Sequence, residues 1–263
     1  MNGIGFAFLL TLFAGLATCL GGVLVIFFKK EQKAVLSVCL SFSAGVMLYI
    51  AFGEIFKESF EMLKDIFGDG TGYLVATIAF FAGIIVMAGI DRLVPHDDKV
   101  ADLIQDSHKE LKHTGVMSAI AIALHNLPEG LVTFMAAMHD PIMGVAVAIA
   151  IIIHNIPEGL AVATPIYYST GKKGKAIAYA AAAGATEPLG ALLAWLVLSN
   201  IFEEIEPVVG IVFAAAAGVM VFVAIHQLLP TAQKHGKHHS VMTWMFAGMV
   251  VMALSLVILE FIF

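Results

Sequence analysis

The chain has 263 residues, of which 60% are hydrophobic and only 13% are charged, and its formal net charge is −6. A soluble domain carries about 25% charged residues, so this composition excludes an ordinary soluble enzyme and indicates an integral membrane protein. The apolar runs reach about 20 residues or more without alternation, which favours helices over a transmembrane β-barrel. Basic residues occur in small groups without interleaved aromatic residues, so the bilayer is an expected partner and nucleic acid is not.

The apolar runs predict an all-α membrane protein with eight transmembrane helices, forming a single transmembrane domain over residues 1–263. The expected spans cover residues 4–28, 34–60, 72–94, 115–138, 141–168, 174–200, 206–231 and 240–263. No Lys or Arg precedes the first run, which argues against a cleaved signal peptide and for a retained first helix.

The distribution of Lys and Arg predicts the orientation of these spans. All but two of the 14 basic residues lie in the links after the first, third, fifth and seventh spans. Cytoplasmic loops carry an excess of positive charge, so we expect these links in the cytoplasm and both termini outside it. The opposite links are acidic, and their carboxylates either concentrate cations at an outer mouth or are ordinary solvated loop acids. These acids are Asp65, Asp69, Asp140, Glu203, Glu204 and Glu206.

The second span carries two candidate functional residues. Glu54 lies seven residues after Met47, so both side chains share one face of a helix. Glu54 is either a functional group within the membrane or a carboxylate that reaches out to the interface. Met47 either lines a site or belongs to the apolar core. At the end of the third span, Asp91 and Arg92 predict a local charge pair at the cytoplasmic boundary.

The fourth and fifth spans contain one heptapeptide twice, as His125-Asn126-Leu127-Pro128-Glu129-Gly130-Leu131 and His154-Asn155-Ile156-Pro157-Glu158-Gly159-Leu160. In each copy His and Glu are four residues apart, so on a helix they lie about 40° apart and one turn displaced. Each pair therefore directs an imidazole and a carboxylate at one region, which is a ligand set for zinc, iron(II) or manganese(II). The alternative is two hydrogen-bonded core histidines, but ionisable groups inside a membrane are costly unless paired or functional.

Prolines and small residues accompany this pattern. Pro128 and Pro157 each leave a carbonyl of the preceding turn without its donor, so we expect a kinked helix with a free acceptor beside the site. Asn126 and Asn155 add amide oxygens. In the sixth span, Glu187 also precedes a proline, within a run of small residues that lets helices approach closely.

The seventh span ends with His226, four residues before a proline. This histidine is either a ligand on a pathway towards the cytoplasm or a helix-capping residue. Two polar links, 95–114 and 234–239, are rich in histidine, and they either receive metal leaving the pathway or are flexible polar loops. No phosphate-binding loop pattern occurs, so ATP-driven pumping by this chain alone is unsupported.

The two His-Asn-x-Pro-Glu-Gly motifs, followed by Glu187-Pro188-Leu189-Gly190-Ala191, resemble the ZIP family of divalent-metal transporters, and most closely its bacterial ZupT-type zinc-uptake branch. The likeness is densest over residues 121–195, and the eight-span plan extends it over the chain. It implies an inverted 3+2+3 repeat, with the fourth and fifth spans between two three-helix units. It also implies a metal site between spans two, four, five and six. Relatives import metal towards the cytoplasm and often form homodimers.

The resemblance also implies two adjacent metal positions. The first has two ligands from span four and a bridging carboxylate from span five, namely His125, Glu129 and Glu158. The second is completed by Asn126, Asn155 and Glu187. Met47 falls where some relatives line the site. Together with the residues singled out above, the candidate metal residues are His125, Asn126, Glu129, His154, Asn155, Glu158, Glu187, Glu54, Met47 and His226.

The expected function is secondary transport of divalent metal ions across a bacterial inner membrane into the cytoplasm. Zn²⁺ is the foremost substrate, with Fe²⁺, Mn²⁺, Co²⁺ and Cd²⁺ as further ones, and no cofactor is expected beyond the transported ion. Polar ligands on proline-broken helices at mid-membrane are typical of such carriers. The alternatives are a passive metal channel and a membrane metalloenzyme with a fixed dinuclear centre. The spacing argues against the enzyme, because di-iron bundles use Glu-x-x-His.

Overall fold

The computed structural model describes residues 3–27, 33–93, 107–200 and 206–262, and this part of the chain is helical almost throughout, without strands. Eight of its helices are long and apolar enough to cross a membrane, which confirms the predicted number of spans. The first four spans are α1 (Gly3–Leu24) with η1 (Val25–Phe27), α2 (Lys33–Ile50) with η2 (Ala51–Ile55) and α3 (Phe56–Phe67), α4 (Asp69–Leu93), and α6 (Ser107–His139). The others are α7 (Pro141–Thr170), α8 (Lys173–Gly184) with α9 (Thr186–Asn200), α10 (Glu206–Val223) with η3 (Ala224–Leu228) and α11 (Leu229–His235), and α12 (His238–Ile262).

Three helices extend beyond the predicted spans. The second span continues through α3 to Phe67, because α3 buries Met62 and Leu63 on one face and exposes polar residues on the other. The seventh span continues through α11 to His235. Helix α6 begins at Ser107, within the segment predicted as a link; residues 107–114 contain neither Gly nor Pro, so their polarity does not prevent a helix. The rest of that link, residues 95–106, lies outside the described residues, as do Glu203 and Glu204.

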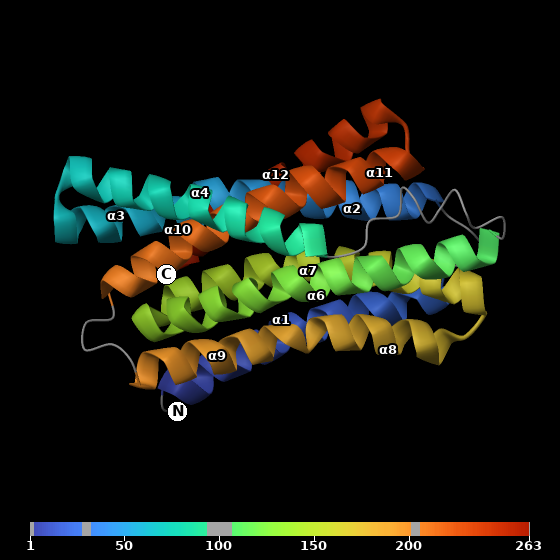
Figure 1. Cartoon of the computed structure of the whole chain (residues 1–263), viewed down its shortest axis with the longest axis horizontal. Helices are drawn as coiled ribbons and strands as arrows, with labels where there is room; N and C mark the ends of the chain where they lie inside the picture. Colours follow the sequence, from blue (N-terminus) through green and yellow to red (C-terminus); the bar gives the residue numbers. More distant parts are fainter. Residues whose placement is uncertain (1–2, 28–32, 94–106, 201–205, 263) are drawn as a thin grey trace.

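The helices run along one axis in two groups (Figure 1). In the first group, α1 packs against α7 and α8, and α6 packs against α7 and α9. In the second, α4 packs against α10, and α12 against α2. Contacts of α7 with α2, and of α6 with α10, join the two groups. The labelled N- and C-terminal ends lie at the same end of the bundle, where α3 also turns into α4 and α6 into α7.

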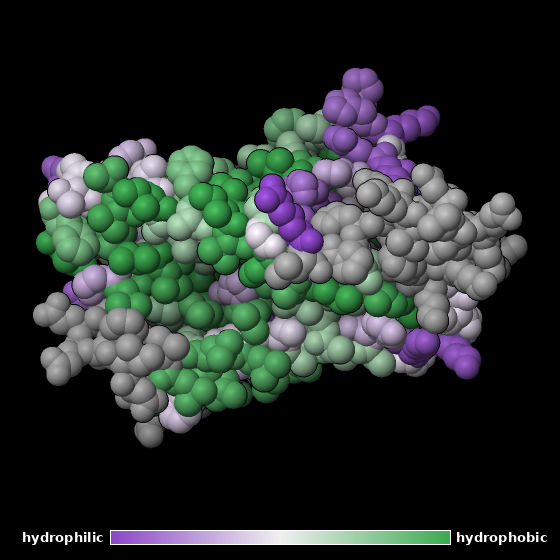
Figure 2. Space-filling model, viewed as in Figure 1, coloured by the Kyte–Doolittle hydropathy of each residue, from purple (hydrophilic) through white to green (hydrophobic). Residues whose placement is uncertain are grey.

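The outer surface of the helices is apolar. Figure 2 shows a broad hydrophobic surface, with the most hydrophilic side chains gathered at the end where α8 begins and α11 ends. Large apolar side chains are exposed along α4 and α12, including Ile85 on α4, which is 70% exposed, and Leu254 on α12, which is 56% exposed. Such a surface is stable in lipid rather than in water. The protein is therefore a multi-pass membrane protein.

Glycines bring the helix backbones into direct contact at matched places. A Cβ at Gly130 of α6 would overlap the carbonyl of Glu187 on α9, and a Cβ at Gly159 of α7 would overlap the carbonyl of Thr18 on α1. The helix pairs α6–α9 and α7–α1 thus approach each other in the same way. The predicted inverted repeat would exchange α6 with α7 and α9 with α1, and would therefore relate these two helix pairs to each other.

The second helix group shows the same correspondence. Its second and seventh spans each pass through a five-residue π-helical segment, η2 beginning at Ala51 and η3 beginning at Ala224, which are 224 − 51 = 173 positions apart. The glycines that pack against neighbouring carbonyls in these spans, Gly45 and Gly218, are also 218 − 45 = 173 positions apart. The two spans therefore share one register, as expected for the repeat, which stays a prediction. Single π-helical turns occur frequently at functional sites.

Candidate metal site

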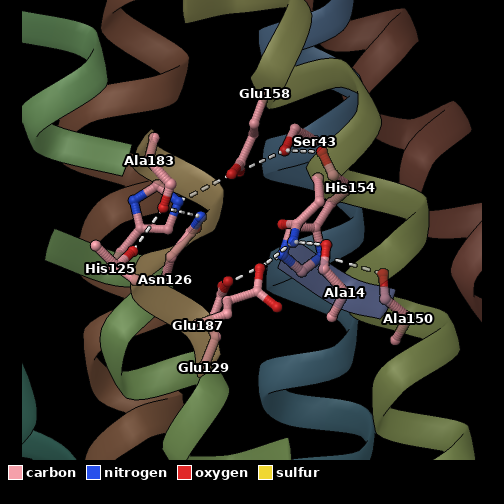
Figure 3. Close-up of polar contacts among 12 residues, drawn as sticks. Ala14, Ser43, His125, Asn126, Glu129, Ala150, His154, Glu158, Ala183 and Glu187 are labelled. Carbon is pink, nitrogen blue, oxygen red and sulfur yellow. Dashed lines mark hydrogen bonds and ion pairs between the residues drawn. The ribbon is translucent and has the colours of Figure 1, made fainter. Parts of the chain in front are cut away.

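The two repeated motifs lie on the antiparallel helices α6 and α7, and their His and Glu side chains face each other (Figure 3). The side chains of His125, Glu129, His154 and Glu158 are all buried, at most 1% exposed. His125 Nε2 lies 2.9 Å from Glu158 Oε2, and His154 Nε2 lies 3.2 Å from Glu129 Oε1. Each imidazole thus contacts the carboxylate of the other helix rather than the one in its own motif. The four-residue spacing places all four groups in one region, and the packing of the helices decides which of them pair.

The local sequence of the motifs explains how these side chains are held. Helices α6 and α7 continue without interruption through Pro128 and Pro157. The glycine two residues after each proline packs against the backbone of α9 or α1. At the start of α7, Asp140 caps the helix by accepting from the backbone N–H of Ile142 at 2.6 Å. The end of each motif is therefore a packing element, and the His and Glu before it lie on helices whose positions are fixed by close backbone contact.

The histidines differ in what orients them. His154 Nδ1 lies 3.1 Å from the carbonyl oxygen of Ala150, one turn earlier on the same helix. An N–H at Nδ1 that donates to this carbonyl leaves Nε2 directed at Glu129, which is the arrangement typical of metal-binding histidines. His125 Nδ1 has no hydrogen-bond partner among the described residues. His154 is therefore held in a fixed orientation by a second hydrogen bond.

The two asparagines and Glu187 extend the cluster. Asn126 Nδ2 donates to the carbonyl of Ala183 at 3.2 Å, and Asn155 Nδ2 donates to the carbonyl of Ala14 at 3.0 Å. Asn155 Nδ2 also contacts Glu187 Oε1, from the first turn of α9. All three side chains are fully buried.

Several buried oxygens in this region accept no hydrogen bond from the described part of the chain. They are Asn126 Oδ1, Glu129 Oε2, Asn155 Oδ1 and Glu187 Oε2. A buried acceptor without a donor costs about 1–3 kcal/mol. A cation bound beside such an oxygen would satisfy it, because each of these oxygens is an electron-pair donor. The donor set therefore fits a divalent transition metal ion.

The cluster is not a preformed metal cage. Among the described residues, no three or more His, Cys, Asp or Glu side chains already have the geometry to hold a metal ion. The imidazoles and carboxylates instead pair with one another at hydrogen-bond distance. An ion that binds here must therefore open at least one of these pairs.

A residue that the sequence analysis did not single out also reaches the cluster. Ser43 of α2 is fully buried and its hydroxyl donates to Glu158 Oε1 at 2.8 Å. The signal that could have identified it is its position four residues before Met47, on the same face of the helix. Met47 is itself fully buried in the apolar core. The second span therefore contributes to the cluster directly through Ser43.

Two predicted site residues do not join the cluster. Glu54 lies in η2, eleven residues after Ser43 and thus about 16 Å further along the helix axis. His226 lies in η3, where its Nε2 is 3.3 Å from Asp91 Oδ2. Gln227 Nε2 donates to Asp91 Oδ1 at 2.7 Å. Asp91, near the end of the third span, therefore contacts the seventh span. Because the helix continues from η3 into α11, His226 does not lie at a helix end.

The chain matches the protein family described as "ZIP Zinc transporter" over residues 98–256. It is 44% identical to the zinc transporter ZupT of Clostridium perfringens, over 98% of this chain and 97% of that protein. It is 45% identical to the zinc transporter ZupT of Chlorobaculum parvum, over 98% of each chain. With the zinc transporter ZupT of Nitratidesulfovibrio vulgaris it shares 46% identity over 96% of each chain. Each of these matches extends over nearly the whole length.

Proposed function

The chain belongs to the ZIP family of zinc transporters, and from this premise we propose that it imports Zn²⁺ across a bacterial inner membrane through the paired His–Glu cluster of α6 and α7. One observation carries the proposal: four ionisable side chains are buried midway along two antiparallel spans and contact one another. Buried ionisable groups in membrane helices mark ion pathways. Because the family is one of transporters, the metalloenzyme alternative is set aside.

The proposed ligands divide into two adjoining positions. His125, Glu129 and Glu158 would bind the ion first, with His154 close to Glu129. Asn126, Asn155 and Glu187 would form the second position, where three acceptor oxygens lack a donor in the described part of the chain. Nitrogen and oxygen ligands replace the water of a dication, yet without a thiolate they release it more readily. The same ligands accept Fe²⁺, Mn²⁺, Co²⁺ and Cd²⁺, which we include as further substrates.

Metal binding would displace protons from this cluster. At 2.9 and 3.2 Å, each imidazole nitrogen and carboxylate oxygen share a proton when no metal is bound. A dication that binds both groups takes the place of that proton, so loading the site releases protons. The burial of all four groups also favours a carrier over a passive channel, because a carrier exposes its closed site to one side at a time.

Further polar side chains lie on either side of the cluster along the direction of the spans. Glu54 lies in the half of the second span nearer the chain termini, and His226 with Asp91 lies in the opposite half of the bundle. On the predicted orientation, Glu54 is on the outer side and the His226–Asp91 pair is on the cytoplasmic side. We propose that Glu54 lines the entry and that the pair receives the ion on its way to the cytoplasm, with Met47 between them.

Zinc uptake into proteoliposomes tests the assignment. The variants His125→Ala and Glu129→Ala should abolish uptake while accumulating normally in the membrane, because each removes a proposed ligand. His139→Ala is the matched control, since His139 is exposed in the last turn of the same helix. Uptake equal to that of the unaltered protein by either ligand variant would overturn the proposed site.

A further inference from the structure

Glu158 differs from the other carboxylates of the cluster in how its oxygens are engaged. Its Oε2 lies 2.9 Å from His125 Nε2, and its Oε1 accepts from the Ser43 hydroxyl at 2.8 Å. Glu129 and Glu187 each have one oxygen with no hydrogen-bond partner among the residues described. Both carboxylate oxygens of Glu158 therefore have a partner, and one of these partners, Ser43, lies in the other helix group.

The hydrogen bond from Ser43 is not the default for a hydroxyl on a helix. Ser and Thr side chains on helices commonly bond back to the carbonyl four residues earlier. Ser41 does so at 2.6 Å, and so do Thr133 at 2.9 Å and Thr164 at 2.6 Å. Such a bond would satisfy the Ser43 hydroxyl without any other helix. The Ser43 hydroxyl instead reaches α7, where Glu158 Oε1 lies at 2.8 Å and the carbonyl oxygen of His154 lies further away, at 3.4 Å.

We propose that Ser43 is a positioning residue that holds Glu158 in the orientation in which it binds the transported ion. The inference rests on the proposed function, because it takes Glu158 to be a ligand. With Oε1 held by the hydroxyl, Oε2 stays directed at the side of the cluster where His125 lies. Removing a hydrogen bond to a metal ligand lowers metal affinity by about 10–100-fold.

The test compares the variants Ser43→Ala and Ser43→Thr with Ser41→Ala. Ser41 is the matched control because it is also fully buried on α2, but its hydroxyl donates to the Ser37 carbonyl of its own helix. Two quantities are measured: equilibrium binding of Zn²⁺ to the purified protein in detergent, and initial uptake into proteoliposomes as a function of zinc concentration. Ser43→Ala should weaken zinc binding and raise KM about tenfold, with the maximal rate nearly unchanged. Ser43→Thr, which keeps a hydroxyl, should restore both, and Ser41→Ala should behave like the unaltered protein.

The inference is overturned if Ser43→Ala binds zinc as tightly as the unaltered protein, or if Ser43→Thr binds as weakly as Ser43→Ala. Should Ser43→Ala fail to accumulate, Ser43→Thr and Ser43→Val replace it, since these two side chains share a shape and differ in the hydroxyl. Equal zinc affinity of that pair overturns the inference, and weaker binding by Ser43→Val supports it. Retained uptake by Glu129→Ala overturns the proposed function instead, so the two failures are distinguishable.

Discussion

At the residue scale, two motifs that differ only at Leu127 and Ile156 produce an unequal site. The His125–Glu158 contact is 2.9 Å long and the His154–Glu129 contact 3.2 Å, and Glu158 has a second donor in Ser43. Glu129 retains an oxygen without a partner in the described part of the chain. Glu129 is therefore the carboxylate with more freedom to turn towards an incoming ion, whereas Glu158 presents a fixed oxygen.

Glu187 should contribute to affinity without being essential. The variant Glu187→Ala removes the carboxyl group that contacts Asn155, and with it the acidic ligand of the proposed second position. The first position keeps its ligands, so we expect KM for zinc uptake to rise about tenfold while uptake persists. Glu206→Ala is the matched control, because Glu206 also lies in the first turn of its helix but is exposed. An unchanged KM for Glu187→Ala would remove this residue from the site.

The sequence predicted the chemistry of the cluster better than its pairing. The spacing of His125 and Glu129 is sufficient to place both on one side of a helix, and a repeated motif identified the partner helix. Which imidazole meets which carboxylate depends on the axial offset between α6 and α7, where Gly144 packs against Ala137 and Gly115 packs against Ile166. Ser43 was missed for a related reason: a serine in an apolar span has an intrahelical partner available, so only its neighbours in space reveal its role.

At the scale of elements, substitution of the glycine in each motif should impair uptake as strongly as substitution of a proposed ligand. In Gly130→Ala and Gly159→Ala, the added Cβ overlaps a backbone carbonyl, which cannot move as the end of a side chain can. Overpacking of this kind costs about 1–3 kcal/mol or more, so both variants should melt at a lower temperature in detergent and lose uptake.

Gly174→Ala provides the control for these variants. Gly174 lies in the first turn of α8, and a Cβ there would meet no atom within 4 Å. Alanine stabilises an exposed helix position by about 0.5–1 kcal/mol relative to glycine, so the melting temperature should be unchanged or slightly higher. Equal melting temperatures for all three variants would contradict the close approach of α6 to α9 and of α7 to α1.

Span positions were predictable because apolar runs of about 20 residues are a strong signal, whereas the π-helical segments were not. A π-helical turn changes the helical period over five residues only, too few for a pattern of apolar residues to reveal. In η2 and η3 it is the placement of Glu54 and His226 that the altered turn affects. The extent of α3 also escaped prediction, since an amphipathic helix with a polar face resembles a link in composition.

At the scale of the whole molecule, the matched contacts relate distant parts of the chain. α1 packs on α7 as α9 packs on α6, and α4 packs on α10 as α12 packs on α2. The inverted repeat stays a prediction; it expects this pattern, because an exchange of the two halves would map the cluster onto itself. Such a relation gives the two sides of the membrane similar surroundings, which suits a site that opens alternately to each side.

Zinc should stabilise the whole fold, because its proposed ligands belong to α6, α7 and α9. A ligand that binds only the folded protein at 100 times its Kd adds about 2.7 kcal/mol of stability. The melting temperature in detergent should therefore rise with zinc concentration, and this rise should be absent in Glu129→Ala. His139→Ala should retain it. Equal stabilisation of Glu129→Ala would show that zinc binds elsewhere on the protein.

The orientation of the bundle can be tested with two glycines at its opposite ends. Gly70 lies at the start of α4, at the end where the chain termini lie, and Gly174 lies among the basic residues at the start of α8. Both are exposed and a Cβ at either would meet no atom within 4 Å, so a cysteine fits at each. With Cys19 and Cys39 replaced by alanine, a membrane-impermeant maleimide should label Gly70→Cys in intact cells. It should label Gly174→Cys only after permeabilisation, because basic links stay in the cytoplasm. The reverse labelling would place Glu54 on the cytoplasmic side and the His226–Asp91 pair outside, and the proposed order of entry and exit would then be wrong.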